Sequence, residues 1–262
     1  MIRTVRTTRY VAPLREGGSV PAIVEADDDG LYVVKLRGAG QGPKALIAEL
    51  VAGQIGRALG LPVPEIVLIE LDVEFGRTEP DPEIAKILSA SAGLNVALDY
   101  LPGSLAFQPF TGGKLDPALA SAVVWFDAFV SNMDRTPRNP NLLLWHRKLW
   151  LIDHGAALYV HHAWSEGVDP LAEAHDRFPQ IESHILLPYA TDIAAADAVQ
   201  SALLTPEKIA GIVAEIPDAW LVDRAPSTDP EESRAAYADY LNRRLAPPRG
   251  FVEEALDARA RR

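Results

Sequence analysis

The sequence predicts an α+β fold in which a β-rich first part is followed by an α-rich second part. Short apolar and β-branched runs, separated by glycine and aspartate turns, fill most of the first hundred positions. Farther along, helix-start signals recur, in which a capping residue precedes a proline. The change falls near Pro102-Gly103, so we expect one unit over residues 1–102 and a second over residues 103–262.

The composition excludes several classes of protein. The chain has 262 residues, 48% of them hydrophobic, which is enough to bury a sizeable core. A formal net charge of -11 argues against a general nucleic-acid binder, which would carry a basic patch. The absence of cysteine excludes disulfides, thiolate metal sites and a catalytic thiol. No apolar run resembles a signal peptide or a membrane span, so we expect no membrane partner and a cytoplasmic location.

Strand patterns dominate the first part, with one helix among them. The turn Asp27–Gly30 has a physical basis, because Asp tolerates turn conformations and Gly supplies a positive φ. Apolar residues at helical spacing predict a helix over Pro43–Leu59, and Gly60 is a natural stop. The strands are expected at Tyr10–Leu14, Val20–Ala26, Leu31–Leu36, Leu61–Asp72 and Gly93–Leu101.

The second part opens with a helix. Asp116 is a cap and Pro117 a first helical residue, and apolar residues continue to Phe129. After a polar loop, the apolar segments Leu142–Trp145 and Leu149–Ile152 predict a β-hairpin. Beyond about residue 170 the pattern is helical, with capped, acid-rich starts at Thr205-Pro206-Glu207 and Asp229-Pro230-Glu231.

Lys35 and Glu49 form the first candidate functional pair. Lys35 lies inside an apolar strand, where an unpaired ammonium would be costly and needs an acidic partner. Glu49, on the following helix, is such a partner. The order strand-lysine then helix-glutamate matches the pair that orients ATP phosphates in kinases. The alternatives are a lysine whose stem covers apolar surface at a sheet edge and a solvated helical glutamate.

The polar loop after Phe129 carries the second set of candidates. Asp134 and Asn139 are five positions apart, which is the spacing of the catalytic Asp and the metal-binding Asn in kinases. Asp153 follows one hairpin later, at the position of the metal-binding Asp in the DFG motif of kinases. The alternative is a helix end whose Asx side chains bond their own backbone, although Asp153 has no place in that interpretation.

These segments carry a family resemblance. Asp134-Arg135-Thr136-Pro137-Arg138-Asn139 and Ile152-Asp153-His154-Gly155 resemble the corresponding loops of HipA-like kinases and, more distantly, of phosphoinositide lipid kinases. The likeness runs from about Tyr10 to Tyr159. It implies a two-lobed, protein-kinase-like α+β fold, with a β-rich N-lobe over residues 1–102 and a helical C-lobe over residues 103–262.

The resemblance also implies roles for individual residues. Asp134 would accept or orient the proton of the attacking hydroxyl, and Asn139 and Asp153 would hold Mg²⁺. Lys35 would bind the α- and β-phosphates of ATP while paired with Glu49. Arg135 and Asn141 would support the loop. We expect the nucleotide partner to be ATP, and the acceptor to be a protein Ser or Thr, although related lipid kinases phosphorylate small-molecule hydroxyls.

Two further segments would contact the nucleotide. Gly17, Gly18 and Ser19 form a candidate phosphate-covering loop and equally fit a simple hairpin turn, and Ser19 is a candidate autophosphorylation site. The stretch Asp99-Tyr100-Leu101 is similar to a hinge whose backbone groups hold adenine.

The sequence departs from the family pattern, and alternatives remain. His154 replaces the Phe of DFG, and HipA is a longer chain with an antitoxin partner, so the resemblance implies no toxin–antitoxin role. The alternatives are a nucleotide-binding module without chemistry and an HD-type metal phosphohydrolase built from His154 and His175-Asp176. We expect His161-His162 at the surface, and Trp125, Trp145 and Trp150 in the core.

Overall fold

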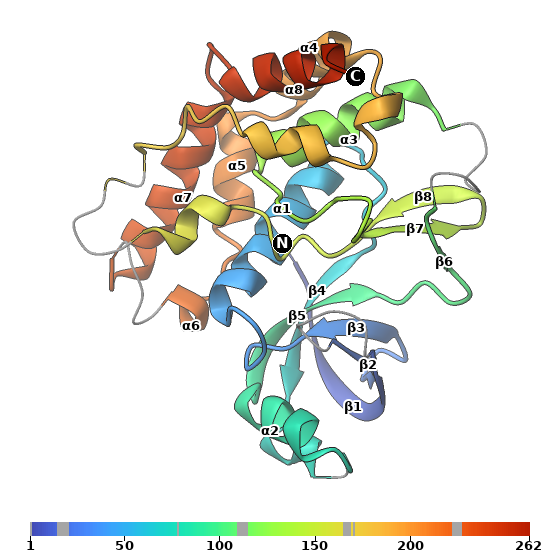
Figure 1. Cartoon of the computed structure of the whole chain (residues 1–262). Helices are drawn as coiled ribbons and strands as arrows, with labels where there is room; N and C mark the ends of the chain where they lie inside the picture. Colours follow the sequence, from blue (N-terminus) through green and yellow to red (C-terminus); the bar gives the residue numbers. More distant parts are fainter. Residues whose placement is uncertain are drawn as a thin grey trace.

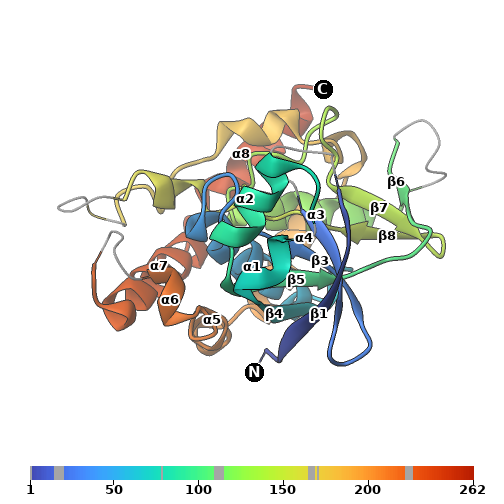
Figure 2. The same cartoon turned by 90° about the horizontal axis from the view of Figure 1, so that it is seen from below.

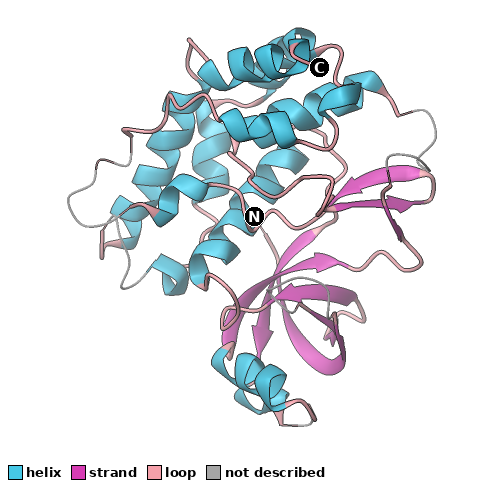
Figure 3. Cartoon of the chain, in the orientation of Figure 1, coloured by secondary structure: helices cyan, strands magenta, loops and turns pink. Residues whose placement is uncertain are grey.

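A computed structural model describes residues 2–14, 21–77, 79–108, 115–164, 169, 171–221 and 227–262. The fold is mixed α/β, with most strands gathered at one end and most helices at the other (Figures 1 and 3). The strands are β1 (Thr4–Pro13), β2 (Ala22–Ala26), β3 (Leu31–Lys35), β4 (Ile66–Leu71), β5 (Gly93–Asp99), β6 (Leu105–Ala106), β7 (Leu142–Trp145) and β8 (Lys148–Leu151). The helices are α1 (Pro43–Ala58), α2 (Pro82–Ala90), α3 (Pro117–Phe129), α4 (Ile193–Leu203), α5 (Pro206–Val213), α6 (Asp218–Leu221), α7 (Pro230–Leu245) and α8 (Gly250–Ala260). Short 3₁₀ turns are η1 (Val73–Gly76), η2 (Tyr159–His162), η3 (Pro179–Ser183) and η4 (Leu187–Tyr189).

Five strands close into a barrel in the order β1-β2-β3-β5-β4. The sequence predicted its first strand at Tyr10–Leu14, but β1 begins at Thr4. That extra length closes the barrel, because the first half of β1 pairs in parallel with β4 while its second half pairs antiparallel with β2. Register shifts within β1 allow the bend that this double pairing requires.

The barrel wall separates two hydrophobic cores. Alternate residues of β4 face opposite sides, so that Val67 and Ile69 lie in the barrel core while Ile66 and Leu68 join a larger helical core. Helix α2 closes the end of the barrel away from the helical body, with Ile84 and Leu88 in the barrel core (Figures 1 and 2). Strand β4 is therefore buried on both faces, which explains its continuous apolar run.

Helix α1 follows the barrel strands in sequence but packs with the helical body. Its buried residues, among them Leu46, Leu50 and Ile55, belong to the same core as α3. In Figure 1 this helix runs between the barrel and the C-terminal helices. Residues on α1 can therefore reach both the barrel wall and the loop that follows α3.

The helix starts that the sequence indicated are confirmed. Asp116, Thr205 and Asp229 accept hydrogen bonds from backbone N–H groups in the first turns of α3, α5 and α7, and each is followed by a proline. Helix α2 was missed, although Asp81 caps it in the same way before Pro82. The expectation of a single helix in the first part was therefore wrong, because α2 needs only a short apolar face to cover the barrel end.

A second, smaller sheet has the order β6-β7-β8. Strands β7 and β8 are the predicted hairpin, and the short strand β6 pairs with β7. The hairpin connects the loop after α3 to Asp153, so it sets where that aspartate lies. No helix among the described residues is long and apolar enough to cross a membrane.

Candidate active site

Lys35 is the last residue of β3 and points out of the barrel. The strand alternates, so that Tyr32 and Val34 face the barrel core while Lys35 faces the other side. Its Nζ lies 2.7 Å from Oδ1 of Asp153, and 12% of the lysine side chain is exposed. Burial alone would lower the pKa of Lys35, but the charges of Asp153 and Glu49 outweigh burial and raise it. Lys35 is therefore a cation at neutral pH.

Glu49 lies on α1 and is fully buried. Its Oε2 accepts the backbone N–H of His154 at 2.9 Å, and its Oε1 lies 3.2 Å from Nδ1 of the same residue. Burial would raise the pKa of Glu49, but the charge of Lys35 and the contacts with His154 lower it to about 2. The sequence predicted a direct Lys35–Glu49 pair. The direct partner of Lys35 is instead Asp153, because His154 offers two nitrogen atoms to the Glu49 carboxylate.

Asp153 reaches this position through an unusual backbone conformation. Its φ is 55°, a region that residues other than glycine seldom adopt. The preceding Ile152 donates its N–H to the carbonyl of Asn141 at 3.1 Å. After it, Gly155 passes close to α1, since a Cβ placed there would lie 3.6 Å from the carbonyl oxygen of Ala45. The Asp153 segment is thus held between the polar loop and α1.

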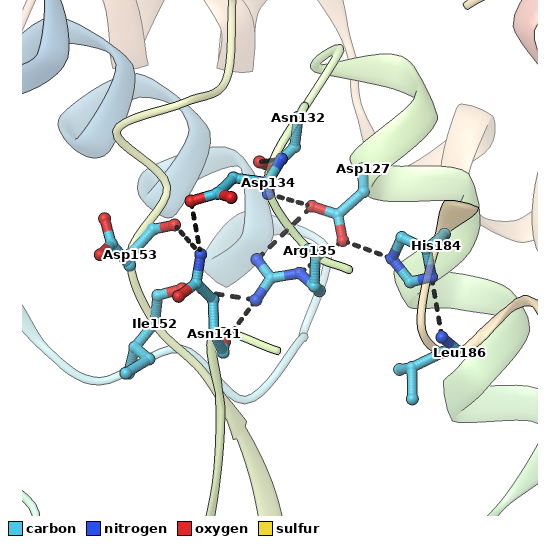
Figure 4. A network of polar contacts seen from close by, with 9 residues as sticks. All are labelled: Asp127, Asn132, Asp134, Arg135, Asn141, Ile152, Asp153, His184 and Leu186. Carbon is cyan, nitrogen blue, oxygen red and sulfur yellow. Dashed lines mark hydrogen bonds and ion pairs between the residues drawn. The ribbon is translucent and has the colours of Figure 1, made fainter. Parts of the chain in front are cut away.

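The structure brings the polar side chains of the loop together. Asn139 donates its Nδ2 to Oδ2 of Asp134 at 2.6 Å, so the two residues that spacing singled out are in contact. Asn141 Nδ2 lies 3.5 Å both from Oδ2 of Asp134 and from the backbone oxygen of Asp153. Asn141 therefore connects the two aspartates, as Figure 4 shows.

Behind the loop lies an ion pair with no exposed surface. Asp127 of α3 binds Arg135, with 2.6 Å between the carboxylate Oδ2 and the guanidinium Nε. Burial would raise the pKa of Asp127, but the charge of Arg135 and a hydrogen bond from His184 lower it well below its usual range. Arg135 also donates to the carbonyl oxygens of Asn141 and Ile152. One guanidinium thus joins the loop to the strand that leads into Asp153 (Figure 4).

Sequence reasoning missed Asp127 and His184. Asp127 had a signal, because it is a lone carboxylate in the apolar run VVWFDAFV and a buried charge requires a partner. His184 had none, since it lies about fifty residues after the loop in a segment with no motif. Only the packing of that segment against α3 connects it to the loop.

The expected hinge follows β5, which ends at Asp99. Burial raises the pKa of Asp99. Tyr100 donates its N–H to the carbonyl of Leu31 at 2.9 Å. Among the described residues, the N–H of Leu101 has no acceptor. The predicted phosphate-covering residues Gly17, Gly18 and Ser19 lie outside the described residues.

The adjacent histidines do not both lie at the surface. His161 is buried, with Nδ1 3.0 Å from the hydroxyl of Tyr237 and Nε2 3.2 Å from Nε2 of His162. The prediction was therefore wrong for His161, because η2 turns one ring inward against α7. Trp125 is fully buried as expected, while Trp145 and Trp150 are half-buried and pack edge to face.

The donor set suits a small, hard cation. The Asp153 side chain is 36% exposed, and Asn141 links its backbone to Asp134, so carboxylate and amide oxygens are available nearby. No group of three or more His, Cys, Asp or Glu side chains forms a candidate metal cluster in the described part of the chain. Mg²⁺ is commonly held by one or two carboxylates together with substrate phosphates, so the residues present fit that ion.

Three solved structures with a similar fold are kinases. The Helicobacter pylori proinflammatory kinase CtkA has 13% identity to this chain and a TM-score of 0.56, over 95% of this chain and 97% of that one. The Golgi casein kinase with Mn and ADP bound has 12% identity and a TM-score of 0.52, over 98% and 74% of the two chains. A second structure of the Golgi casein kinase has 11% identity and a TM-score of 0.50, over 98% and 72%.

The fold is one that this chain shares with kinases of known structure. The sequence profile of the HipA-like kinase family matches residues 8–246, so the chain belongs to the HipA-like kinase family. The resemblance that the loop motifs indicated is thereby confirmed. No curated protein matches the chain in sequence.

Proposed function

We propose that this chain is an ATP- and Mg²⁺-dependent kinase that transfers the γ-phosphoryl group to a hydroxyl, with a protein serine or threonine as acceptor. One observation carries the proposal: Lys35 and Asp153 are in contact, and Asn141 connects Asp153 to the Asp134–Asn139 pair. A cation, two carboxylates and two amides, drawn from distant parts of the chain, thus meet in one place. Protein kinases use a lysine, two aspartates and an asparagine of this kind for phosphoryl transfer.

Each residue has a role that follows from its chemistry. Asp134 orients the attacking hydroxyl and accepts its proton, and Lys35 binds the α- and β-phosphates, for which it would exchange its contact with Asp153. Asp153 and Asn139 would hold Mg²⁺, which would supply positive charge to neutralise the phosphates. Asn139 now donates to Asp134, so its carbonyl oxygen is the atom left for the metal. Glu49 keeps Lys35 charged from its buried position on α1.

The barrel and the helical body divide the work of binding. In this proposal the chain divides near residue 102 into a barrel unit, which covers the nucleotide, and a helical unit. The Leu101 N–H, which has no acceptor among the described residues, donates to adenine. Support comes from the Golgi casein kinase with Mn and ADP bound, whose fold this chain shares. That enzyme is named for casein, a protein, which supports a protein acceptor for the present chain as well.

Two substitutions test the assignment. We expect Asp134→Ala and Asp153→Ala each to lower ATP-dependent phosphorylation on the order of a hundredfold or more, because each removes a contact made in the transition state. The measurement is intact mass and transfer from radiolabelled ATP after incubation with Mg²⁺, with and without cell extract as a source of acceptor. Circular dichroism of both variants controls for folding. Unchanged turnover in both would show that the assignment is wrong.

The same assay separates the alternatives. Binding of ATP with neither hydrolysis nor phosphorylation would identify a nucleotide-binding module. Metal-dependent phosphatase activity without ATP would favour the HD-type hydrolase, whose candidate ligands are placed poorly for it. His154 is buried against Glu49, and Asp176 accepts the N–H of Phe178 at 2.6 Å. A mass increase that maps to Ser19 would identify it as an autophosphorylation site.

A further inference from the structure

His184 contacts the candidate active site from behind, although it lies outside every motif of the sequence. It follows η3, and 4% of the residue is exposed. Its Nε2 lies 2.9 Å from Oδ2 of Asp127, the carboxylate that binds Arg135. The next residue, Ile185, donates its N–H to the backbone oxygen of Arg135 at 3.1 Å. The segment therefore touches the loop twice, once through a side chain and once through the backbone.

The contacts of His184 determine which ring nitrogen carries the proton. Nδ1 accepts the backbone N–H of Leu186 at 3.0 Å, so it has no hydrogen of its own. A neutral imidazole carries its single hydrogen on the other nitrogen, and Nε2–H therefore donates to Asp127. Burial also lowers the pKa of His184, which favours the neutral ring. One imidazole thus fixes a backbone N–H on one side and a carboxylate on the other (Figure 4).

The Asp127 carboxylate transmits this contact to the loop. Its Oδ2 accepts from Arg135 and His184, and its Oδ1 accepts Nδ2 of Asn132 at 2.8 Å. Since all of these groups are buried, the carboxylate has no water to replace a lost donor. Without the His184 hydrogen bond, Oδ2 would keep only Nε of Arg135, while Oδ1 would keep Asn132 and a longer contact with Nη2 of Arg135 at 3.5 Å. The carboxylate would then be held less tightly on the Oδ2 side, and its plane could shift.

Arg135 carries the effect to the reacting groups. Its Nη1 donates to the carbonyl oxygens of Asn141 and Ile152, two residues that a backbone hydrogen bond also joins. The side chain of Asn141 then reaches Asp134 and the backbone of Asp153. A turn of the Asp127 carboxylate would therefore shift the guanidinium and, through it, both aspartates. Displacements of about 1 Å at reacting groups are enough to cost on the order of a hundredfold in rate.

We propose that His184 is a positioning residue for phosphoryl transfer, which acts through Asp127 and Arg135 on the placement of Asp134 and Asp153. This inference rests on the proposed kinase function. The positioning effect comes from the Nε2–H group, which donates to Asp127. The Nδ1 atom, which accepts from Leu186, stabilises the backbone of residues 184–186.

Two substitutions separate the functions of the two nitrogens. In His184→Gln, the longer side chain places an amide N–H near the position of Nε2 and keeps the donor to Asp127. In His184→Asn, the shorter side chain keeps an acceptor near Nδ1 for Leu186 and loses that donor. The exposed His175→Asn is the matched control for a histidine-to-asparagine change.

We expect His184→Asn to lower kcat per folded molecule by about tenfold to a hundredfold, as for other residues that support metal or catalytic ligands. KM of His184→Asn for ATP should change by less than about threefold. The kcat of His184→Gln should stay within about threefold of the wild type, since its amide donor restores the contact with Asp127. Thermal unfolding measures the folded fraction, so that a loss of stability is not counted as a loss of rate. Nitrogen-15 spectra of histidine-labelled wild-type protein provide a readout without nucleotide, and they should show the Nε2–H tautomer.

The outcomes distinguish this inference from the kinase assignment. Wild-type protein that turns over no ATP contradicts the proposed function and the inference with it. An active wild type in which both His184 variants have equal kcat per folded molecule contradicts the positioning role alone. An Nδ1–H tautomer of His184 in the spectra also overturns the positioning role, because the donor to Asp127 would then be absent.

Discussion

The two sides of the loop that contains Asp134 satisfy their charges in different ways. On the back, Asp127 and Arg135 have no exposed surface, and each makes several hydrogen bonds. On the front, Lys35 and Asp153 form a single close ion pair, and the Asp153 side chain is 36% exposed. The back is therefore built to hold one geometry, whereas the front can exchange its partners for a ligand. Groups that stabilise the fold and groups that suit chemistry therefore lie on opposite sides of the same loop.

The largest expected effect on stability is at the back. Asp127→Ala leaves the Arg135 guanidinium buried without a carboxylate, and we expect the free energy of unfolding to fall by about 3–5 kcal/mol. Denaturant unfolding at neutral pH measures the change. A loss below about 1 kcal/mol would remove the distinction between the two sides, because such a loss is typical of exposed pairs.

Glu49 combines features of both sides of the loop, because it is buried like Asp127 but its charge acts on Lys35 at the front. Its pKa is about 2 in the folded chain and about 4.5 when unperturbed. A lowered pKa means that the ionised form stabilises the fold above about pH 4.5, and that this stability is lost as pH falls from there toward about 2. Since one pKa unit is about 1.4 kcal/mol, the loss is on the order of 3 kcal/mol.

The measurement is the unfolding free energy of the wild type and of Glu49→Gln over the range from about pH 7 to about pH 3. The variant should be less stable near neutrality and should approach the wild type on acidification. Parallel curves for the two proteins would show that Glu49 does not titrate as described.

Asp153→Asn sharpens the contrast from the front. This substitution keeps the shape of the side chain and removes its charge, so ATP-dependent turnover should fall by about a hundredfold or more. The free energy of unfolding should stay within about 1 kcal/mol of the wild type, because the group is partly exposed and Lys35 retains the charge of Glu49 nearby. Turnover and unfolding measured on one preparation test both statements. A destabilisation as large as that of Asp127→Ala would contradict them.

The smallest effect is expected far from the loop. Arg177 contacts Glu253, Glu254 and Asp257 of α8, but 45% of its side chain is exposed. Exposed ion pairs are screened by solvent and contribute little, so Arg177→Ala should leave both the denaturation midpoint and the turnover unchanged. A clear shift of the midpoint would show that the number of contacts, and not burial, decides what an ion pair contributes here.

Much of the fold was readable because its signals are local. Asp116-Pro117, Thr205-Pro206 and Asp229-Pro230 each start a helix, because a cap and a fixed φ act within a few residues. The closure of the barrel was not readable, since it depends on β1 pairing with β4 across about sixty residues. Helix α2 carried the same local signal, a capping Asp81 before Pro82, but we predicted no helix there.

The candidate site divides in the same way. Spacing identified Asp134, Asn139 and Asp153 as a set, and the structure brings Asp134 into contact with Asn139 and, through Asn141, close to Asp153. The order of strand and helix predicted an ion pair between Lys35 and Glu49, but the direct contact of Lys35 is with Asp153. An ion pair depends on three-dimensional distance, and in the folded chain both oxygens of Glu49 contact His154.

The sequence alone determined the family, the α+β composition and the polar residues that gather at the loop, because motifs and caps are written in consecutive positions. Tertiary structure decided the partners: Lys35 with Asp153, Glu49 with His154, and His184 with Asp127. The physical reason is that a buried charge takes whichever complementary group packing brings to it, and packing joins segments far apart in the chain.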